Sequence, residues 1–283
     1  LGRPKTYPRF VSAPDSTRSS SEDLVLADTT EVTEECKGDF GHYGMVGAGC
    51  VDPTDFHRSG LLIGLKEQNE TGVNPIKLGA IGSTDTHSAT PGAALESDWR
   101  GHVTLESTPQ ERLKPGLLTS GIDGNPGGLA GVWARENSRD AIFSAMQRRE
   151  VFGTSGTRII PRFFAGWDYP ETICSSADLS KIGYANGVPM GSDLPTPTAV
   201  NKNPVFVAAA SQDINSAPLV EIQLIKGWID KEGNMRNKIL SVIKEPKGAK
   251  SLCGLYSDTT FNEKELSYYY LRVLEAPTKR WSE

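Results

Sequence analysis

Two residues able to hold a metal ion follow a short apolar run in the first third of the chain. Residues 76–81 form a mostly apolar run interrupted by glycine, which predicts a buried strand. Asp85 and His87 follow, and side chains two residues apart on a strand lie on one face. A carboxylate and an imidazole that converge suit Zn, Mn or Fe better than Ca or Mg. The alternative is that Asp85 caps a turn and His87 is an ordinary surface residue.

Helices predicted on both sides of this run would position it. An Asp-Pro pair at residues 52–53 is typical of a helix start, and Gly72 ends the apolar stripe that follows. A helix that leads into a strand is one α/β unit, as a β/α barrel requires. A second helix is predicted from a cap at Asn137 or Ser138 to about Glu150.

Three further residues are candidates for contact with a substrate. The long segment 91–128 leaves the end of the predicted strand, so we expect it to cover the site and His102 to touch substrate. Glu136 precedes the second helix and is a candidate to position water near the metal, or else it complements the helix dipole. Arg158 lies in a predicted strand–turn–strand, residues 151–160, and matches phosphate oxygens bidentately, unless it forms a structural salt bridge.

The chain changes character near Arg162. Short apolar runs separated by Pro, Gly, Asn and Asp turns predict a β-sandwich. Residues 220–226 alternate with period two, and residues 230–234 read as the turn of a hairpin. The three tyrosines at 268–270 are expected to pack within a sheet.

Composition excludes several classes of protein. The net charge of −5 leaves no basic patch of the density that nucleic acid requires. No run approaches the 18 apolar residues of a membrane span. The four cysteines suit two disulfides in an oxidising compartment, or four buried thiols in the cytosol. We predict a bond between Cys174 and Cys253, which lie in turn-rich stretches that could meet across the two sheets of the sandwich, and a second bond between Cys36 and Cys50.

Six segments of the chain resemble one large bacterial family, DUF3604. They keep the family's order and lie within a resemblance that spans about residues 50–283: residues 72–92, 128–139, 154–158, 162–167, 187–194 and 270–275. DUF3604 proteins look like relatives of the PHP (polymerase and histidinol phosphatase) metal-dependent phosphoesterases. The resemblance implies that a late barrel strand ends in Asp-x-His and that both residues, here Asp85 and His87, bind metal. It also favours an exported protein, periplasmic or extracellular.

One departure from the family shapes the functional prediction. The His-Thr and Thr-Asp-His motifs of the family's N-terminal half are absent, and the chain has only four histidines. We therefore predict an α/β plus β architecture: residues 1–160 form the C-terminal part of a distorted PHP-like β/α barrel, and residues 161–283 form a β-sandwich. A second polypeptide carrying the N-terminal half is expected to complete a metal-dependent hydrolase site for a phosphoester or other small ester. The alternative is a non-catalytic binding or structural module derived from this fold.

Overall fold

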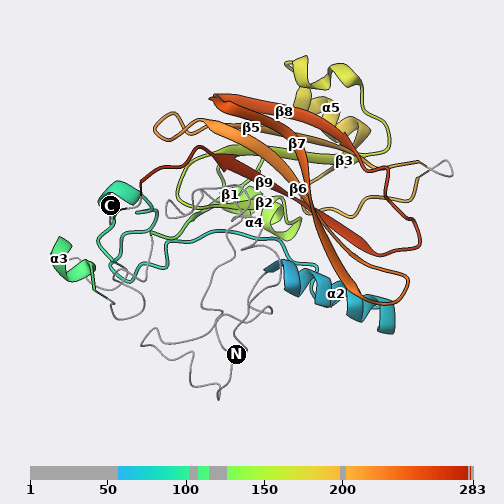
Figure 1. Ribbon diagram of the computed structural model, residues 1–283, viewed down its shortest axis with the longest axis horizontal. Helices are drawn as coiled ribbons and strands as arrows, with labels where there is room; N and C mark the ends of the chain where they lie inside the picture. The colour runs from blue at the N-terminus through green and yellow to red at the C-terminus, as the bar shows by residue number, and fades with distance from the viewer. Residues whose placement is uncertain (1–56, 102–107, 115–125, 198–201, 280, 282–283) are drawn as a thin grey trace.

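The computed structural model describes residues 57–101, 108–114, 126–197, 202–279 and 281 (Figure 1). Its helices are α2 (His57–Thr71), η3 (Glu96–Asp98), α3 (Pro109–Arg112), α4 (Arg139–Gln147), η5 (Glu171–Ser175) and α5 (Leu179–Asn186). Its strands are β1 (Leu129–Val132), β2 (Val151–Thr154), β3 (Ile160–Gly166), β4 (Gly187–Pro189), β5 (Val205–Ser211), β6 (Leu219–Ile229), β7 (Met235–Ala249), β8 (Ser251–Ser257) and β9 (Ser267–Glu275).

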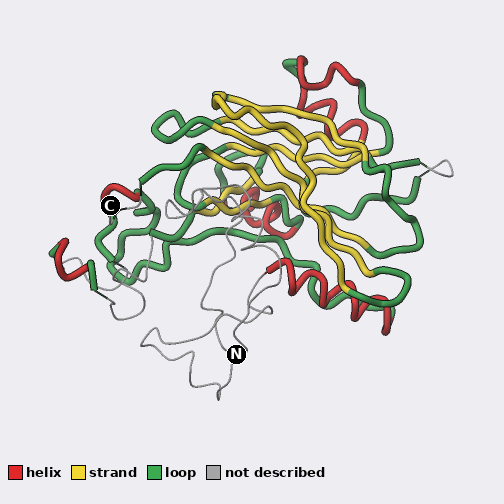
Figure 2. The backbone as a smooth tube through the Cα atoms, in the orientation of Figure 1, coloured by secondary structure: helices red, strands yellow, loops and turns green. Residues whose placement is uncertain are grey.

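Two antiparallel sheets make up most of the chain after β2. One has the strand order β4-β3-β5-β8 and the other the order β7-β6-β9. Figure 2 shows the strands of the described chain in yellow. Their main core contains the stacked rings of Phe163 and Phe206, together with Ile222, Leu224 and Val273, each fully buried. This arrangement of antiparallel sheets with few helices is consistent with the predicted sandwich. The strand pairs of the described residues are all antiparallel, so the parallel pairing of a β/α barrel is not seen there.

Local sequence signals set several element boundaries as predicted. The helix α2 ends at Thr71, directly before Gly72, which adopts φ +81° and donates its backbone N–H to the Gln68 carbonyl. The predicted helix start at residues 52–53 lies outside the described residues. The Ser138 hydroxyl caps α4 by accepting from Ala141 N. The hairpin between β6 and β7 is also confirmed, since the Asp230 carboxylate accepts from the backbone N–H groups of Glu232 and Asn234.

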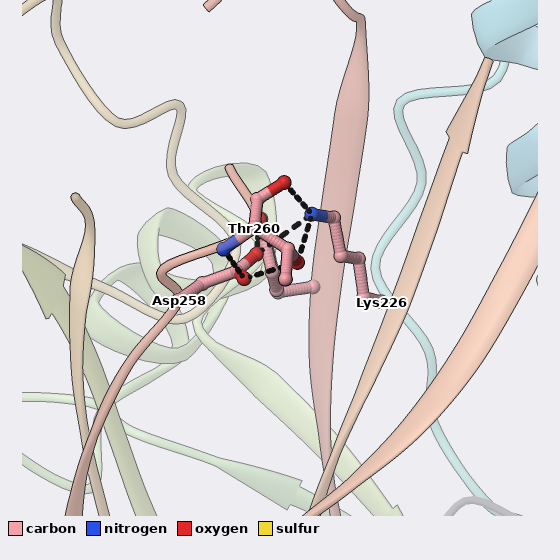
Figure 3. A network of polar contacts seen from close by, with 4 residues as sticks. Lys226, Asp258 and Thr260 are labelled. Atoms are coloured by element: carbon pink, nitrogen blue, oxygen red, sulfur yellow. Dashed lines mark hydrogen bonds and ion pairs between the residues drawn. The ribbon is translucent and has the colours of Figure 1, made fainter. Parts of the chain in front are cut away.

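A buried polar network fixes the loop before β9 against β6 (Figure 3). Lys226 Nζ donates to Asp258 Oδ2 at 2.7 Å, and the Tyr269 hydroxyl donates to the same oxygen at 2.7 Å. Asp258 is fully buried, and burial by itself would raise its pKa. Hydrogen bonds from Lys226, Thr260 and Tyr269 outweigh that effect and hold the pKa at about 2. The network therefore stabilises the charged carboxylate in the protein interior.

The structure confirms the predicted disulfide but corrects its setting. Cys174 and Cys253 are bonded, with Cα atoms 5.6 Å apart. Cys174 lies on η5 and Cys253 on β8, so the bond ties a helical turn to the four-stranded sheet and does not join the two sheets. It adjoins a second core cluster that includes Phe164 and Ile173. Cys36 and Cys50 lie outside the described residues.

Candidate functional site

The predicted strand at residues 76–81 is wrong. The segment is extended but has no strand partner in the described part of the chain, and Leu78 and Ile81 are 61% and 50% exposed. It lies across glycines of the β1–β2 sheet, too close to admit side chains. A Cβ atom on Gly82 would lie 2.7 Å from the Leu129 oxygen, and one on Gly153 would lie 2.7 Å from Gly82 N. The apolar run therefore packs by backbone contact, which a period-based prediction does not anticipate.

This extended segment runs in the same direction as β2. Gly79 lies against Arg149 and Val151, while Gly82, three residues on, lies against Gly153 and the Thr154 carbonyl. The contacts advance along both segments together, which defines their common direction. Because α2 leads into the first segment and α4 leads into β2, two helix-then-extended units lie side by side.

The Asp85–His87 pair follows in a tight loop. The Ser83 carbonyl accepts from Gly128 N at 2.8 Å, which holds the loop beside the start of β1. Asp85 and Ala89 adopt positive φ values of 50° and 54°, so the side-chain alternation of a strand does not apply here. Asp85 is half-buried and His87 is exposed; neither side chain makes a hydrogen bond or ion pair with any described residue. That both ligate one metal stays a prediction.

Arg158 lies beyond the same end of the β1–β2 sheet. The two strands are antiparallel, so Leu129 at the start of β1 pairs with Thr154 at the end of β2, and Arg158 follows four residues later. Its side chain is exposed, and its backbone N–H donates to Asp213 Oδ2 at 2.8 Å. The structural salt bridge considered for Arg158 does not form with any described carboxylate. The guanidinium charge helps to lower the pKa of the nearby Asp213 carboxylate, and its exposed N–H groups remain open to an anion.

Glu136 lies at the opposite end of this sheet. It follows β1, whose last residue Val132 pairs with Val151, and the three steps from Leu129 span about 10 Å. Its exposed carboxylate accepts from the hydroxyl of Ser138, the cap of α4. This contact fits the helix-terminus role, and the placement separates Glu136 from the Asp85–His87 loop. His102 lies outside the described residues, and those residues contain no group of three His, Cys, Asp or Glu side chains suited to a metal.

Two carboxylates near Arg158 escaped the sequence analysis. Glu275 ends β9 with 2% exposure, and its Oε1 atom has no hydrogen-bond partner in the described structure. Burial raises the pKa of Glu275, the hydroxyls of Ser216 and Thr157 oppose that shift, and the Asp213 charge adds to it. The pKa of Asp213 is lowered, chiefly by the hydrogen bond from Asn215 N. In the sequence, Glu275 could have been noticed as an ionisable residue at the end of an apolar strand.

Comparison with known proteins defines the family. The family model described as "Protein of unknown function (DUF3604)" matches residues 45–245 and 242–283. The chain belongs to the DUF3604 family. No curated protein and no solved structure matches it. Across the described residues, the helices are too short or too polar to traverse a membrane.

A separate feature of this DUF3604 chain is a cavity of about 480 Å³. It lies between α2, the extended segment, β2, β9 and the loop after β4, and its walls are mainly aromatic and aliphatic. The candidates Asp85, His87, Glu136 and Arg158 do not line it. The cavity and the Asp85–His87 loop are therefore two distinct places in this DUF3604 chain.

Proposed function

We propose that this DUF3604 chain contributes Asp85, His87 and Arg158 to a metal-dependent hydrolase site that acts on phosphoesters. One observation carries the proposal: the Asp85–His87 loop and Arg158 lie at the same end of the β1–β2 sheet, and the side chains of these three residues form no hydrogen bond or ion pair with a described residue. Groups without structural partners at one end of a sheet are available for a ligand.

The donor set fits a divalent transition metal. Asp85 offers carboxylate oxygens and His87 an imidazole nitrogen, which Zn, Mn and Fe accept. The positive φ of Asp85 and Ala89 supports a loop held in an uncommon conformation, a feature that clusters at functional sites. When bound, such a metal would withdraw charge from the ester and make a water acidic enough to attack at neutral pH. Arg158 would bind phosphate oxygens and orient the substrate.

The finer fold belongs to the same proposal. We assign residues 1–160 to the C-terminal part of a distorted PHP-like β/α barrel and residues 161–283 to a β-sandwich. The two helix-then-extended units that run in one direction, ending in the Asp85–His87 loop and in β2, support the barrel. The Cys174–Cys253 bond supports an oxidising location, periplasmic or extracellular.

We also propose that a second polypeptide, carrying the N-terminal half of the barrel, completes the site. Two ligands cannot close a catalytic zinc site, which needs about three from protein. In the described structure, the backbone of residues 78–82 makes no hydrogen bond, and Val73, Leu78 and Ile81 are 66%, 61% and 50% exposed. An extended apolar segment without strand partners is suited to pairing with another chain.

The test is metal content and phosphatase activity of the particle purified from its native source or co-expressed with the N-terminal half. We expect about one or two transition-metal ions per particle and hydrolysis of an aryl phosphate. Asp85→Asn and His87→Ala should each remove metal and activity together, whereas Asp140→Asn, on the exposed face of α4, should retain both. A particle without stoichiometric metal, or one in which the three variants behave alike, would refute the hydrolase.

The non-catalytic module is then the second candidate. It is favoured by the lack of any three-residue metal-ligand group among the described residues. In that outcome the barrel portion and the sandwich would serve binding alone.

A further inference from the structure

The cavity beside β9 has the size and walls of a small-molecule site. Its volume of about 480 Å³ falls within the range of ligand pockets in proteins. Aromatic and aliphatic side chains from distant parts of the chain form the walls, among them Leu65, Phe152, Trp167, Met190, Phe261 and Tyr268. Trp167 is fixed on two sides, since its Nε1 donates to the Pro195 carbonyl at 2.8 Å and its ring meets Phe261 edge-on at 5.8 Å.

Arg149 lines this cavity in a fixed position. Its backbone has φ +59°, directly after the C-terminus of α4. Nε donates to the Gly191 carbonyl at 2.8 Å, and Nη1 donates to the Lys77 carbonyl at 3.0 Å. These two neutral acceptors hold the guanidinium and leave its charge uncompensated, with the N–H groups of Nη2 remaining for a ligand. Gly191 has φ +84° and contacts the Arg149 backbone where a side chain would clash.

Among the described residues that line the cavity, Arg149 is the cation without an ion-pair partner. Lys77 Nζ is paired with Asp193 Oδ2 at 2.9 Å, so those two charges neutralise each other. Burial lowers the pKa of His57 and favours its neutral form. Glu265, on the loop that leads into β9, forms no ion pair with Arg149. An arginine held by carbonyls beside aromatic walls is complementary to an anion with an apolar body.

We propose that this cavity binds a small organic anion with an aromatic body, whose oxyanion rests on Arg149. The aromatic body would exclude water from the apolar walls, and the oxyanion would accept the remaining guanidinium donors. The site does not depend on the proposed hydrolase, because the metal-site residues lie outside the cavity lining.

The test uses two probes on the full 283-residue chain: 8-anilinonaphthalene-1-sulfonate and its neutral analogue N-phenyl-1-naphthylamine. Calorimetric titration should give one site for each, with the sulfonate bound more tightly and its affinity falling as salt is raised. Arg149→Gln should weaken sulfonate binding about tenfold and leave the neutral probe unchanged. The matched control is Arg148→Gln, which removes a neighbouring arginine that pairs with Glu150 and does not line the cavity; it should change neither affinity.

A second variant tests the location independently of Arg149. Ala80 lines the cavity, and Ala80→Trp should place an indole ring in the binding space and abolish binding of both probes while circular dichroism stays unchanged. The proposal is overturned if the wild-type chain binds neither probe, if sulfonate binding shows no salt dependence and equals that of the neutral probe, or if Ala80→Trp still binds both. It is equally overturned if a folded Arg149→Gln behaves like Arg148→Gln.

Discussion

The two antiparallel sheets formed by β3 to β9, called the sandwich below, and the described residues before β3, called the first region, are stabilised in different ways. In the sandwich, Leu219, Ile222 and Val273 are fully buried, strands pair over most of their length, and a charged Lys226–Asp258 pair is satisfied inside the core. Before it, an extended apolar segment rests on glycines, leaves Leu78 and Ile81 exposed, and ends in a loop with side chains that no described residue binds. The first pattern is typical of a scaffold whose side chains are packed within the chain. The second, with exposed apolar side chains and polar side chains without partners, is typical of a surface that binds a ligand or another chain.

Truncating one leucine in each region should give the largest difference in the free energy of unfolding. Leu224→Ala removes a fully buried side chain from the sandwich and should lower the free energy of unfolding by about 2–5 kcal/mol. Leu78→Ala, at a 61% exposed position, should change it by no more than about 0.5 kcal/mol. Urea denaturation of both variants measures this. Equal losses would show that the extended segment is as well packed as the sandwich.

The disulfide should stabilise the sandwich by a comparable amount. The double variant Cys174→Ser, Cys253→Ser opens a loop of 79 residues and should cost about 2–4 kcal/mol. Reduction of the wild-type chain, followed by urea denaturation, should give a loss at least as large as that of the double variant, since reduction would also break the predicted Cys36–Cys50 bond. A reduced wild-type chain as stable as the oxidised one would contradict the assigned pairing.

The buried carboxylate should make the sandwich sensitive to acid. Asp258 has a folded pKa of about 2, below its unfolded value, so its stabilisation is complete above the unfolded pKa and is lost as pH falls toward 2. We expect this loss to be roughly 2 kcal/mol between pH 5 and pH 2. Asp258→Asn should abolish that part of the pH dependence in denaturation curves recorded across this range. A variant that keeps the full wild-type slope would place the effect elsewhere.

In the first region, we expect stability to depend on close backbone contacts at glycines more than on buried side chains. Gly82→Ala would place a Cβ 2.7 Å from the Leu129 oxygen and 2.8 Å from the Thr154 oxygen, and should destabilise the chain by about 1–2 kcal/mol. Gly60→Ala is the control, because nothing lies within 4 Å of its Cβ and alanine favours helix α2. It should be neutral or stabilising. If both substitutions are tolerated alike in thermal melts, the close backbone crossing is not a constraint.

Sequence signals predicted the elements whose causes are local. The cap at Ser138, the stop at Gly72 and the turn at residues 230–234 depend on neighbours within a few positions, and all three were confirmed. The prediction of a strand at residues 76–81 was wrong because strand pairing depends on which backbone segment lies alongside. The apolar pattern of one segment carries no information about its partner.

The sequence could suggest residue types for the candidate site but not their arrangement, and metal binding by Asp85 and His87 stays a prediction. Asp85, His87 and Arg158 stood out by chemistry and family resemblance, whereas Glu275 and Arg149 acquire their surroundings only through contacts between distant segments. Arg149, for example, bonds to carbonyls 42 and 72 residues away. No local pattern reports such contacts, so burial and unpaired charge became visible only in the folded chain.

The central claim is that the first region holds half of a metal site, which a second polypeptide completes. Calorimetric titration of Zn or Mn into this chain, alone and after mixing with the N-terminal half, tests it most directly. The account predicts weak binding by the chain alone and tight, stoichiometric binding by the mixture, lost again with Asp85→Asn. Tight binding by the chain alone that survives Asp85→Asn, or no gain when the N-terminal half is added, would contradict it.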